Sequence, residues 1–334
     1  MGEAHLKPEA RASDPAAAVP RTTEVAPGVL RLQEPDGPRF ICQFVVRGAD
    51  ATLIVDAGLP GSPEHTIVPA IDPRLRHVLL ITHPDTDHCG GTSQLVAALP
   101  GLEVIAHEAD AGALGDPERT IEVRYRRFAA DGVEPDAPTL ARLRSRLGGA
   151  FALDGTFADG HEIDLGARVC RLVHLPGHSP GHTGAWLPDD RVLIAADAAM
   201  GWGIRKVDGS LLYAPQFSSP AVYRQTIDRI AELRPATMLC THEPPLEGAE
   251  IDAFLDASRE AVVWFEAAVE AALDVGARTL PEVCADVHRR HAGLPDARPS
   301  DLAMSVAGIL DAMVTTGRAH VDRTGVGRAW RPAA

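Results

Sequence analysis

The sequence predicts an α/β fold followed by a smaller, mostly helical domain. Strand-like, loop-like and helix-like segments alternate over residues 22–110. Polar residues gather where these strands end, which is where α/β folds place their chemistry. From about Gly248 onward, helical segments replace the strands. We therefore expect a flexible tail over 1–21, an α/β domain over 22–247 and a helical domain over 248–334.

The first elements are short strands. Val25–Arg31 and Phe40–Val46 are β-rich runs, and Thr52–Val55 is a buried-strand run followed by Asp56 and a Gly/Pro turn. In "RHVLLITHPDTDH", the strand Val78–Ile81 carries a polar cluster at its C-terminal end. The segment "GGTSQLVAALPG" then predicts a helix, and "LEVIAHEAD" predicts another strand.

Residues 111–150 break this rhythm, because they are charged and compatible with helices. We interpret them as an insertion, either a lid over a functional site or a solvated helical decoration. The "RYRR" run within it, Arg124–Arg127, is interpreted as an exposed helix face. Strands resume after residue 160 and end with Met238–Cys240. Three helical segments and a hairpin-like "HVDRTGVGRAWRP" follow, and this order predicts a winged-helix-like domain.

Composition narrows the classes of function. The net charge of −14 argues against a nucleic-acid partner, because phosphate binding needs a positive surface. No apolar run approaches the roughly 20 residues of a membrane span, and the N-terminus lacks the apolar core of a signal peptide. The five cysteines show no CxxC pairing and are expected to be reduced thiols. We expect a cytoplasmic protein with a small-molecule substrate, and the sequence leaves its oligomeric state open.

A short loop, "THPDTDHCGG", concentrates side chains that bind metals. On extended backbone His83, Asp85 and Asp87 alternate and could share a face, while His88 faces elsewhere. One loop could therefore serve two ions. Further donors follow apolar runs far along the chain, and these are His178 in "HLPGHSPGH", Asp197 in "VLIAADA" and His242 in "MLCTHEPP".

These motifs, with Asp56 in "IVDAG" before them, occur in the order typical of the metallo-β-lactamase superfamily, which the chain resembles over roughly residues 22–247. The resemblance implies an αββα sandwich with a dinuclear metal site at one edge of two sheets. It assigns His83, residue 85 and His178 to one ion, and Asp87, His88 and His242 to the other. Asp197 would bridge the ions, and Asp56 would hold the loop by hydrogen bonds. His182, four residues after His178, is expected to support the site rather than to ligate.

Asp85 departs from the family pattern, because most hydrolytic members carry His there. A carboxylate is an anionic, hard donor, so it weakens the metals as Lewis acids and shifts preference from zinc toward iron or manganese. The flavodiiron branch of the superfamily has a carboxylate at this position. We expect Asp85 to be a ligand; otherwise its short side chain leaves one ion weakly held or absent.

The resulting prediction is a metal-dependent hydrolase with two divalent ions, zinc in the first place. A hydroxide shared by the ions would attack an ester, thioester or lactone, and Asp87 would handle the proton. Arg205 and Tyr213 are weaker candidates for contacts with substrate. Asp85 motivates one alternative, a non-haem di-iron redox enzyme or oxygenase. The basic C-terminal segment motivates another, a nuclease.

Overall fold

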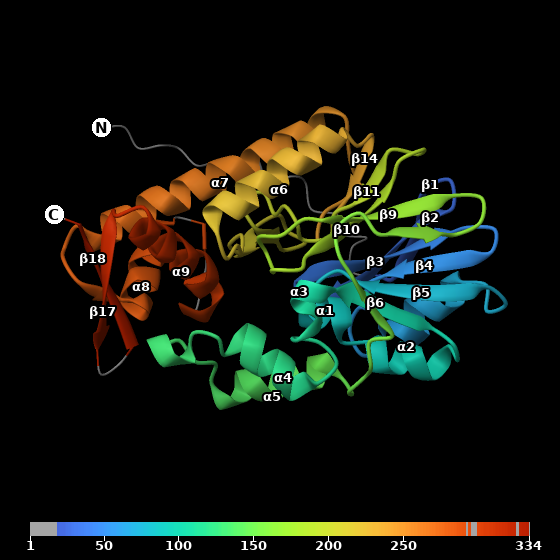
Figure 1. The fold of residues 1–334 in the computed structure, drawn as a ribbon, viewed down its shortest axis with the longest axis horizontal. Coiled ribbons are helices and arrows are strands. Elements are labelled where there is room, and N and C mark those ends of the chain that lie inside the picture. Colours follow the sequence, from blue (N-terminus) through green and yellow to red (C-terminus); the bar gives the residue numbers. More distant parts are fainter. Residues whose placement is uncertain (1–18, 292, 295–298, 325–326, 334) are drawn as a thin grey trace.

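The computed structural model describes residues 19–291, 293–294, 299–324 and 327–333, so most of the predicted tail lies outside the described residues. Two β-sheets pack face to face, with helices on both outer faces (Figure 1). The first sheet has seven strands in chain order. They are β1 (Arg21–Ala26), β2 (Val29–Asp36), β3 (Arg39–Arg47), β4 (Ala51–Val55), β5 (Arg76–Ile81), β6 (Glu103–His107) and β7 (Gly155–Phe157). Strands β1 to β4 pair antiparallel, and β4 to β7 pair parallel.

The second sheet has six strands in the order β15-β14-β11-β10-β9-β8. Their bounds are β8 (Glu162–Asp164), β9 (Val169–His174), β10 (Thr183–Leu187), β11 (Val192–Ile194), β14 (Thr237–Leu239) and β15 (Leu246–Glu247). A separate two-stranded ribbon consists of β12 (Ile204–Arg205) and β13 (Leu211–Tyr213).

Successive side chains of a strand point to opposite faces of the sheet, and this alternation explains why each strand contributes to two core layers. In β4, Leu53 and Val55 belong to the core between the sheets, while Ile54 belongs to the core under the outer helices. The inner core also takes Leu172 and Ile194 from the second sheet. These buried, nearly continuous apolar runs are what strands covered on both faces require. The predicted αββα sandwich is confirmed.

Helices cover the outer faces of both sheets. The helical segments that connect strands of the first sheet include η2 (Pro63–Ile67), η3 (Val68–Ala70), α1 (Thr86–Cys89) and α2 (Thr92–Ala98). The second sheet is covered by α6 (Pro220–Leu233) and α7 (Ala249–Leu273), which lie side by side (Figure 1). The short helix α3 (Glu108–Ala111) leads into the inserted segment, which contains α4 (Pro117–Thr120), the π-helical turn η4 (Ile121–Tyr125), η5 (Ala129–Asp131) and α5 (Ala137–Leu147).

The C-terminal segment has the predicted order of helices and hairpin. Helices α7, α8 (Leu280–Arg290) and α9 (Pro299–Thr315) precede the strands β17 (Ala319–Thr324) and β18 (Gly327–Pro332), which β16 (Arg278–Thr279) joins at the edge next to β18. One apolar core runs from Tyr223 of α6 through Phe265 of α7 to Leu310 of α9. No helix in the described ranges is long and apolar enough to cross a membrane.

The insertion and the C-terminal hairpin are joined directly. Arg328 of β18 forms an ion pair with Asp131 of the insertion, with 2.8 Å between Nη2 and Oδ2. Gly327 passes so close that a Cβ there would lie 2.5 Å from the Ala130 carbonyl oxygen. The insertion thereby contacts the C-terminal hairpin through η5, and it contacts α1, which follows β5 of the first sheet, through α5.

Replacing Phe265 with Ala should lower the free energy of unfolding by about 3–5 kcal/mol, because a fully buried ring at the centre of the α6–α7 core would leave a cavity. Val263→Ala on the same helix is the matched control: this side chain is 59% exposed, so its loss should cost less than about 0.5 kcal/mol. Urea unfolding of both variants measures the difference. Equal losses in the two variants would show that α7 does not pack as described.

Candidate metal centre

Two buried histidines point the same ring nitrogen toward one place. Thr82 Oγ1 donates to Asp56 and lies 3.0 Å from His83 Nδ1, so it accepts the Nδ1 proton. His88 Nδ1 donates to Asp56 Oδ2 at 2.7 Å. Both rings therefore keep the Nε2 lone pair for the site, and neither Nε2 has a hydrogen-bond partner. Buried, unpartnered nitrogens of this kind are expected where a metal binds.

Two more histidines arrive from the second sheet with the same orientation. His178 Nδ1 lies 3.0 Å from the Gln216 carbonyl oxygen, and His242 Nδ1 lies 3.2 Å from the Phe40 carbonyl oxygen. A carbonyl oxygen only accepts, so each Nδ1 carries the proton and each Nε2 presents a lone pair. The loop after β5 and the loops after β9 and β14 thus converge on one edge of the sandwich.

The distances between these atoms fit tetrahedral metal coordination. Two donors that each lie about 2.1 Å from a zinc ion are about 3.4 Å apart. Asp197 Oδ2 lies 3.5 Å from His88 Nε2 and 3.4 Å from His242 Nε2, and His242 Nε2 lies 3.5 Å from Asp87 Oδ2. Around Asp85 Oδ2, the distances are 3.4 Å to His83 Nε2 and 3.0 Å to His178 Nε2.

The predicted ligands therefore fall into the two expected halves. The first half holds His83, Asp85 and His178, and the second holds Asp87, His88 and His242. Asp197 lies with His83 and His88 in a third group, which places its carboxylate between the halves. His182 donates no ligand atom to these groups. Its Nε2 instead accepts from the backbone N–H of Asp197 at 3.2 Å, and its ring stacks on His83.

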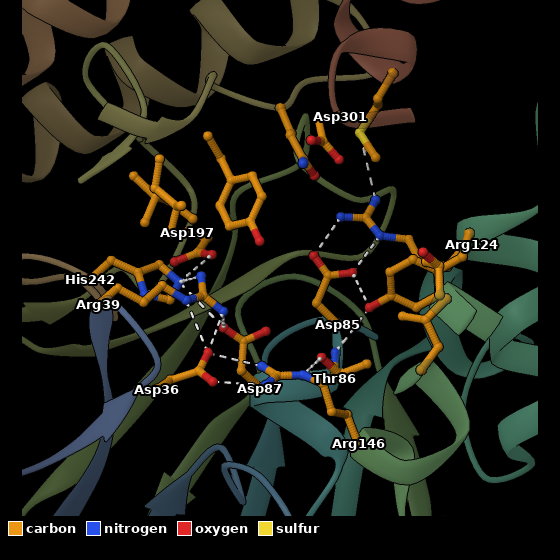
Figure 2. Close-up of a pocket in the computed structure, with 18 of the residues that line it drawn as sticks. Asp36, Arg39, Asp85, Thr86, Asp87, Arg124, Arg146, Asp197, His242 and Asp301 are labelled. Atoms are coloured by element: carbon orange, nitrogen blue, oxygen red, sulfur yellow. Dashed lines mark hydrogen bonds and ion pairs between the residues drawn. The ribbon is translucent and has the colours of Figure 1, made fainter. Parts of the chain in front are cut away.

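The centre lies at the bottom of a cavity of about 340 Å³ (Figure 2). Its walls come from the loop after β5, from the insertion, from the β12–β13 ribbon and from α9. The insertion supplies Arg124, Tyr125, Arg142 and Arg146. The insertion therefore lines the cavity, the position that the lid interpretation of residues 111–150 requires.

The two weaker candidates for substrate contacts, Tyr213 and Arg205, differ in where the structure places them. Tyr213 lines the cavity, and its ring centroid lies 5.7 Å from Arg39 Cζ. Arg205 does not line it, since its Nη1 donates to the Gly209 carbonyl oxygen within the ribbon turn at 2.9 Å. The two-residue strand β12 turns Ile204 toward the cavity and Arg205 away from it.

Sequence reasoning missed two arginines that contact predicted ligands. Arg39 donates to Asp87 Oδ2 at 2.7 Å and to Asp36 at 3.0 Å, as Figure 2 shows. Arg124 donates to both oxygens of Asp85 and is only 5% exposed, so its interpretation as part of an exposed helix face is wrong. Burial works against an ionised Asp85, yet the Arg124 guanidinium holds the pKa of this carboxyl well below its usual range. The carboxylate at position 85, where the family pattern has His, was the available signal for a nearby cation.

Asp56→Asn should weaken metal binding about tenfold to a hundredfold, the usual cost of losing an outer hydrogen-bond partner. The amide would turn a donor toward His88 Nδ1–H, which favours the tautomer whose proton blocks Nε2. Thr82→Ser is the matched control, because it keeps the hydroxyl that Asp56 and His83 share. Competition with a chromophoric chelator measures both affinities. An Asp56→Asn protein with unchanged zinc affinity would refute this role for Asp56.

Comparison with known proteins agrees with this geometry. The family model described as the metallo-beta-lactamase superfamily matches residues 36–242. A hydroxyacylglutathione hydrolase from Methylococcus capsulatus is 29% identical over 245 residues, 72% of this chain and 75% of that protein. An acyl-coenzyme A thioesterase from Homo sapiens, MBLAC2, is 28% identical over 205 residues, 57% of this chain and 67% of that protein.

Solved structures show the same fold along nearly the whole chain. A beta-lactamase domain protein from Burkholderia ambifaria matches with a TM-score of 0.71 at 19% identity, and the match covers 96% of this chain and 97% of that one. A metallo-beta-lactamase family protein from Thermus thermophilus matches with a TM-score of 0.68 at 20% identity, covering 92% and 100%. The solved structures show the shared fold, and the family model, which matches more than half of the chain, shows that the chain belongs to the metallo-beta-lactamase superfamily.

Proposed function

We propose that the protein is a metal-dependent hydrolase that cleaves an acyl thioester of a small, anionic molecule, with esters and lactones as the neighbouring substrate classes. One observation carries this proposal: histidine Nε2 atoms and carboxylates converge, with metal-like spacing, at the bottom of a cavity. Two relatives that each match more than half of the chain support the thioester, because their names give a hydroxyacylglutathione and an acyl-coenzyme A as substrates.

The residues present suit two divalent ions. His83, Asp85 and His178 would hold one, Asp87, His88 and His242 the other, with Asp197 between them. When bound, such ions supply Lewis acidity and lower the pKa of water toward neutrality. Zinc is the first expectation, and the carboxylate at position 85 keeps iron or manganese as alternatives.

The chain's own residues would bind and orient the substrate. Asp87 reaches the cavity beside His242 and is the group placed to take the proton of an attacking water. Arg142, exposed on α5 at the cavity, offers a positive charge to an anionic substrate group. Tyr213 and Met304 also line the cavity and contribute apolar surface, which suits an acyl chain.

The alternatives have less support in the structure. The di-iron redox enzyme was motivated by the negative charge of Asp85, and Arg124 balances this charge, which weakens the reason to prefer iron over zinc. A nuclease depends on the basic C-terminal segment. There, Arg289 and Arg290 pair with Asp286, and Arg331 pairs with Asp322. These ion pairs leave little net positive charge for a phosphate backbone.

The test begins with the metal content of the purified protein. Zinc-loaded protein is then assayed with acyl-coenzyme A and acyl-glutathione thioesters, their oxygen-ester analogues and a lactone. We expect release of free thiol that stops on chelation and returns with zinc. Failure on all three classes with metal bound would refute the hydrolase. Oxygen consumption by the iron-loaded protein, or cleavage of an oligonucleotide, would favour the corresponding alternative.

A further inference from the structure

Arg124 enters the metal centre from the insertion. It stands on the π-helical turn η4, and its guanidinium donates to Asp85 Oδ1 at 2.6 Å and to Asp85 Oδ2 at 2.8 Å (Figure 2). Nη2 lies 2.9 Å from His178 Nε2, and Nη1 donates to the His178 carbonyl oxygen at 2.9 Å. Met304 of α9 contacts Nη1 from the far side. A buried cation is thus built into one half of the centre.

The contact with His178 uses the lone pair that a metal would need. His178 Nδ1 faces the Gln216 carbonyl oxygen and carries the proton, so Nε2 has one lone pair. A guanidinium has no acceptor and keeps its charge, so Arg124 is the donor in this hydrogen bond. One lone pair cannot accept an N–H and bind a metal at the same time. Arg124 and an ion therefore exclude each other at His178.

The carboxylate oxygens of Asp85, like His178 Nε2, already accept hydrogen bonds from Arg124. Its Oδ1 accepts from Arg124 and, at 3.2 Å, from the Tyr125 hydroxyl. Its Oδ2 accepts from Arg124 and keeps one lone pair toward His83. A bidentate pair of this kind needs a planar carboxylate, which His at position 85 could not supply. Asp85 and Arg124 consequently form one unit, which gives a reason for the departure from the family pattern.

The other half of the centre differs. Arg39 donates to Asp87 at 2.7 Å, and its Nη1 lies 3.4 Å from His242 Nε2, a longer and weaker contact than the 2.9 Å between Arg124 and His178. His88 Nε2 has no hydrogen-bond partner, which is also true of His83 Nε2 in the first half. The Asp197 carboxylate accepts no arginine in the ion pairs of the described residues. The arginine therefore competes less strongly for the histidine in this half, and His88 and Asp197 remain available to an ion.

We propose that Arg124 is a resident competing cation, which makes the two halves unequal: the Asp87–His88–His242 half binds one ion tightly, and the His83–Asp85–His178 half binds the other at least about tenfold more weakly. This inference rests on the metal centre of the proposed function. Binding of the second ion requires Arg124 to leave His178. Because Arg124 belongs to the insertion, this movement also changes the cavity wall that the insertion forms.

The experiment titrates metal-free protein with zinc and with cobalt, using calorimetry and the visible absorption of cobalt, and needs no enzymatic activity. Wild type should show one tight ion and one weaker ion. Arg124→Met should bind the second ion about tenfold to a hundredfold more tightly, since Asp85 and His178 lose their competitor and Asp85 loses its buried counter-charge. Arg142→Met is the matched control, an arginine of the same cavity wall without a ligand contact, and should titrate like wild type.

Wild type that binds two ions with equal affinity would overturn the inference, and this measurement needs no variant to fold. An unchanged second affinity in folded Arg124→Met would overturn it as well. Arg124→Lys provides an independent variant: an ammonium cannot bridge Asp85 and His178 as the planar fork does, so the second ion should again bind more tightly. Absence of any metal binding in wild type would refute the proposed function itself, and this result is distinct from two equal sites.

Discussion

Asp87→Asn is expected to lower kcat/KM for the preferred thioester by about 10²–10⁴-fold, the range for loss of a positioned acid–base group. Asn has nearly the shape of Asp but cannot take a proton. It would also leave Arg39 without the carboxylate that it contacts at 2.7 Å inside the cavity. Steady-state kinetics at saturating zinc, with the bound metal determined on the same sample, separates loss of the base from loss of the ion.

The control for Asp87→Asn is Asp208→Asn, a change to an exposed carboxylate that binds only Ser210 in its own turn. Its kcat/KM should equal that of wild type. If Asp87→Asn retains its metal and its kcat/KM falls less than about threefold, Asp87 is not the base, because the loss would lie well below the range for such a group. If it loses both the metal and the activity, Asp87 is a ligand whose role in proton transfer must be tested by the pH profile.

Asp197→Ala should have the largest effect of all. Its carboxylate lies between the two halves, 3.5 Å from His88 Nε2 and 3.4 Å from His242 Nε2, and its backbone is held by His182. Loss of an outer partner of a metal ligand already costs about tenfold to a hundredfold. Loss of a ligand shared by both ions should cost more than about 10³-fold in kcat/KM, equal to about 4 kcal/mol of transition-state stabilisation.

Metal analysis and kinetics on the same Asp197→Ala sample test this expectation. We expect less than one ion per chain after removal of free zinc, with activity near background. Asp189→Ala, on the exposed turn between β10 and β11, is the control and should keep both properties. Full metal content and full activity in Asp197→Ala would remove Asp197 from the centre and with it the dinuclear arrangement.

The inserted segment links the metal centre to the C-terminal part of the chain. Arg124 contacts Met304 of α9, and Asp131 pairs with Arg328 of β18. The segment that carries the competing cation is therefore tied to the C-terminal helices as well as to Asp85. We therefore expect changes at the Asp131–Arg328 pair to shift Arg124 and, with it, metal binding by the His83–Asp85–His178 half.

The alternation of strands and helices and the ligand-type residues at the strand ends could be predicted from local rules: an apolar run forms a buried strand, and the residue after it lies at the edge of the sheet. The αββα sandwich came from the family resemblance, which the order of the motifs carries. His83, His178, Asp197 and His242 could be placed in this way because each follows such a run. The support by Asp56 came from the family resemblance, and its hydrogen bonds to Thr82 and His88 agree with it.

The side chains that surround those ligands depend on tertiary contacts and could not be predicted from the sequence. Arg124 lies 39 residues from Asp85 in a segment without strand periodicity, and nothing in its spacing distinguishes it from the exposed arginines nearby. Its place is set by the packing of the insertion between α9 and the first sheet. The same holds for Arg39, which meets His242 across 203 residues, and for Arg205, which the β12–β13 ribbon turns away. Strand ends position side chains by local geometry, whereas partners across a cavity are selected by contacts that form only when the chain has folded.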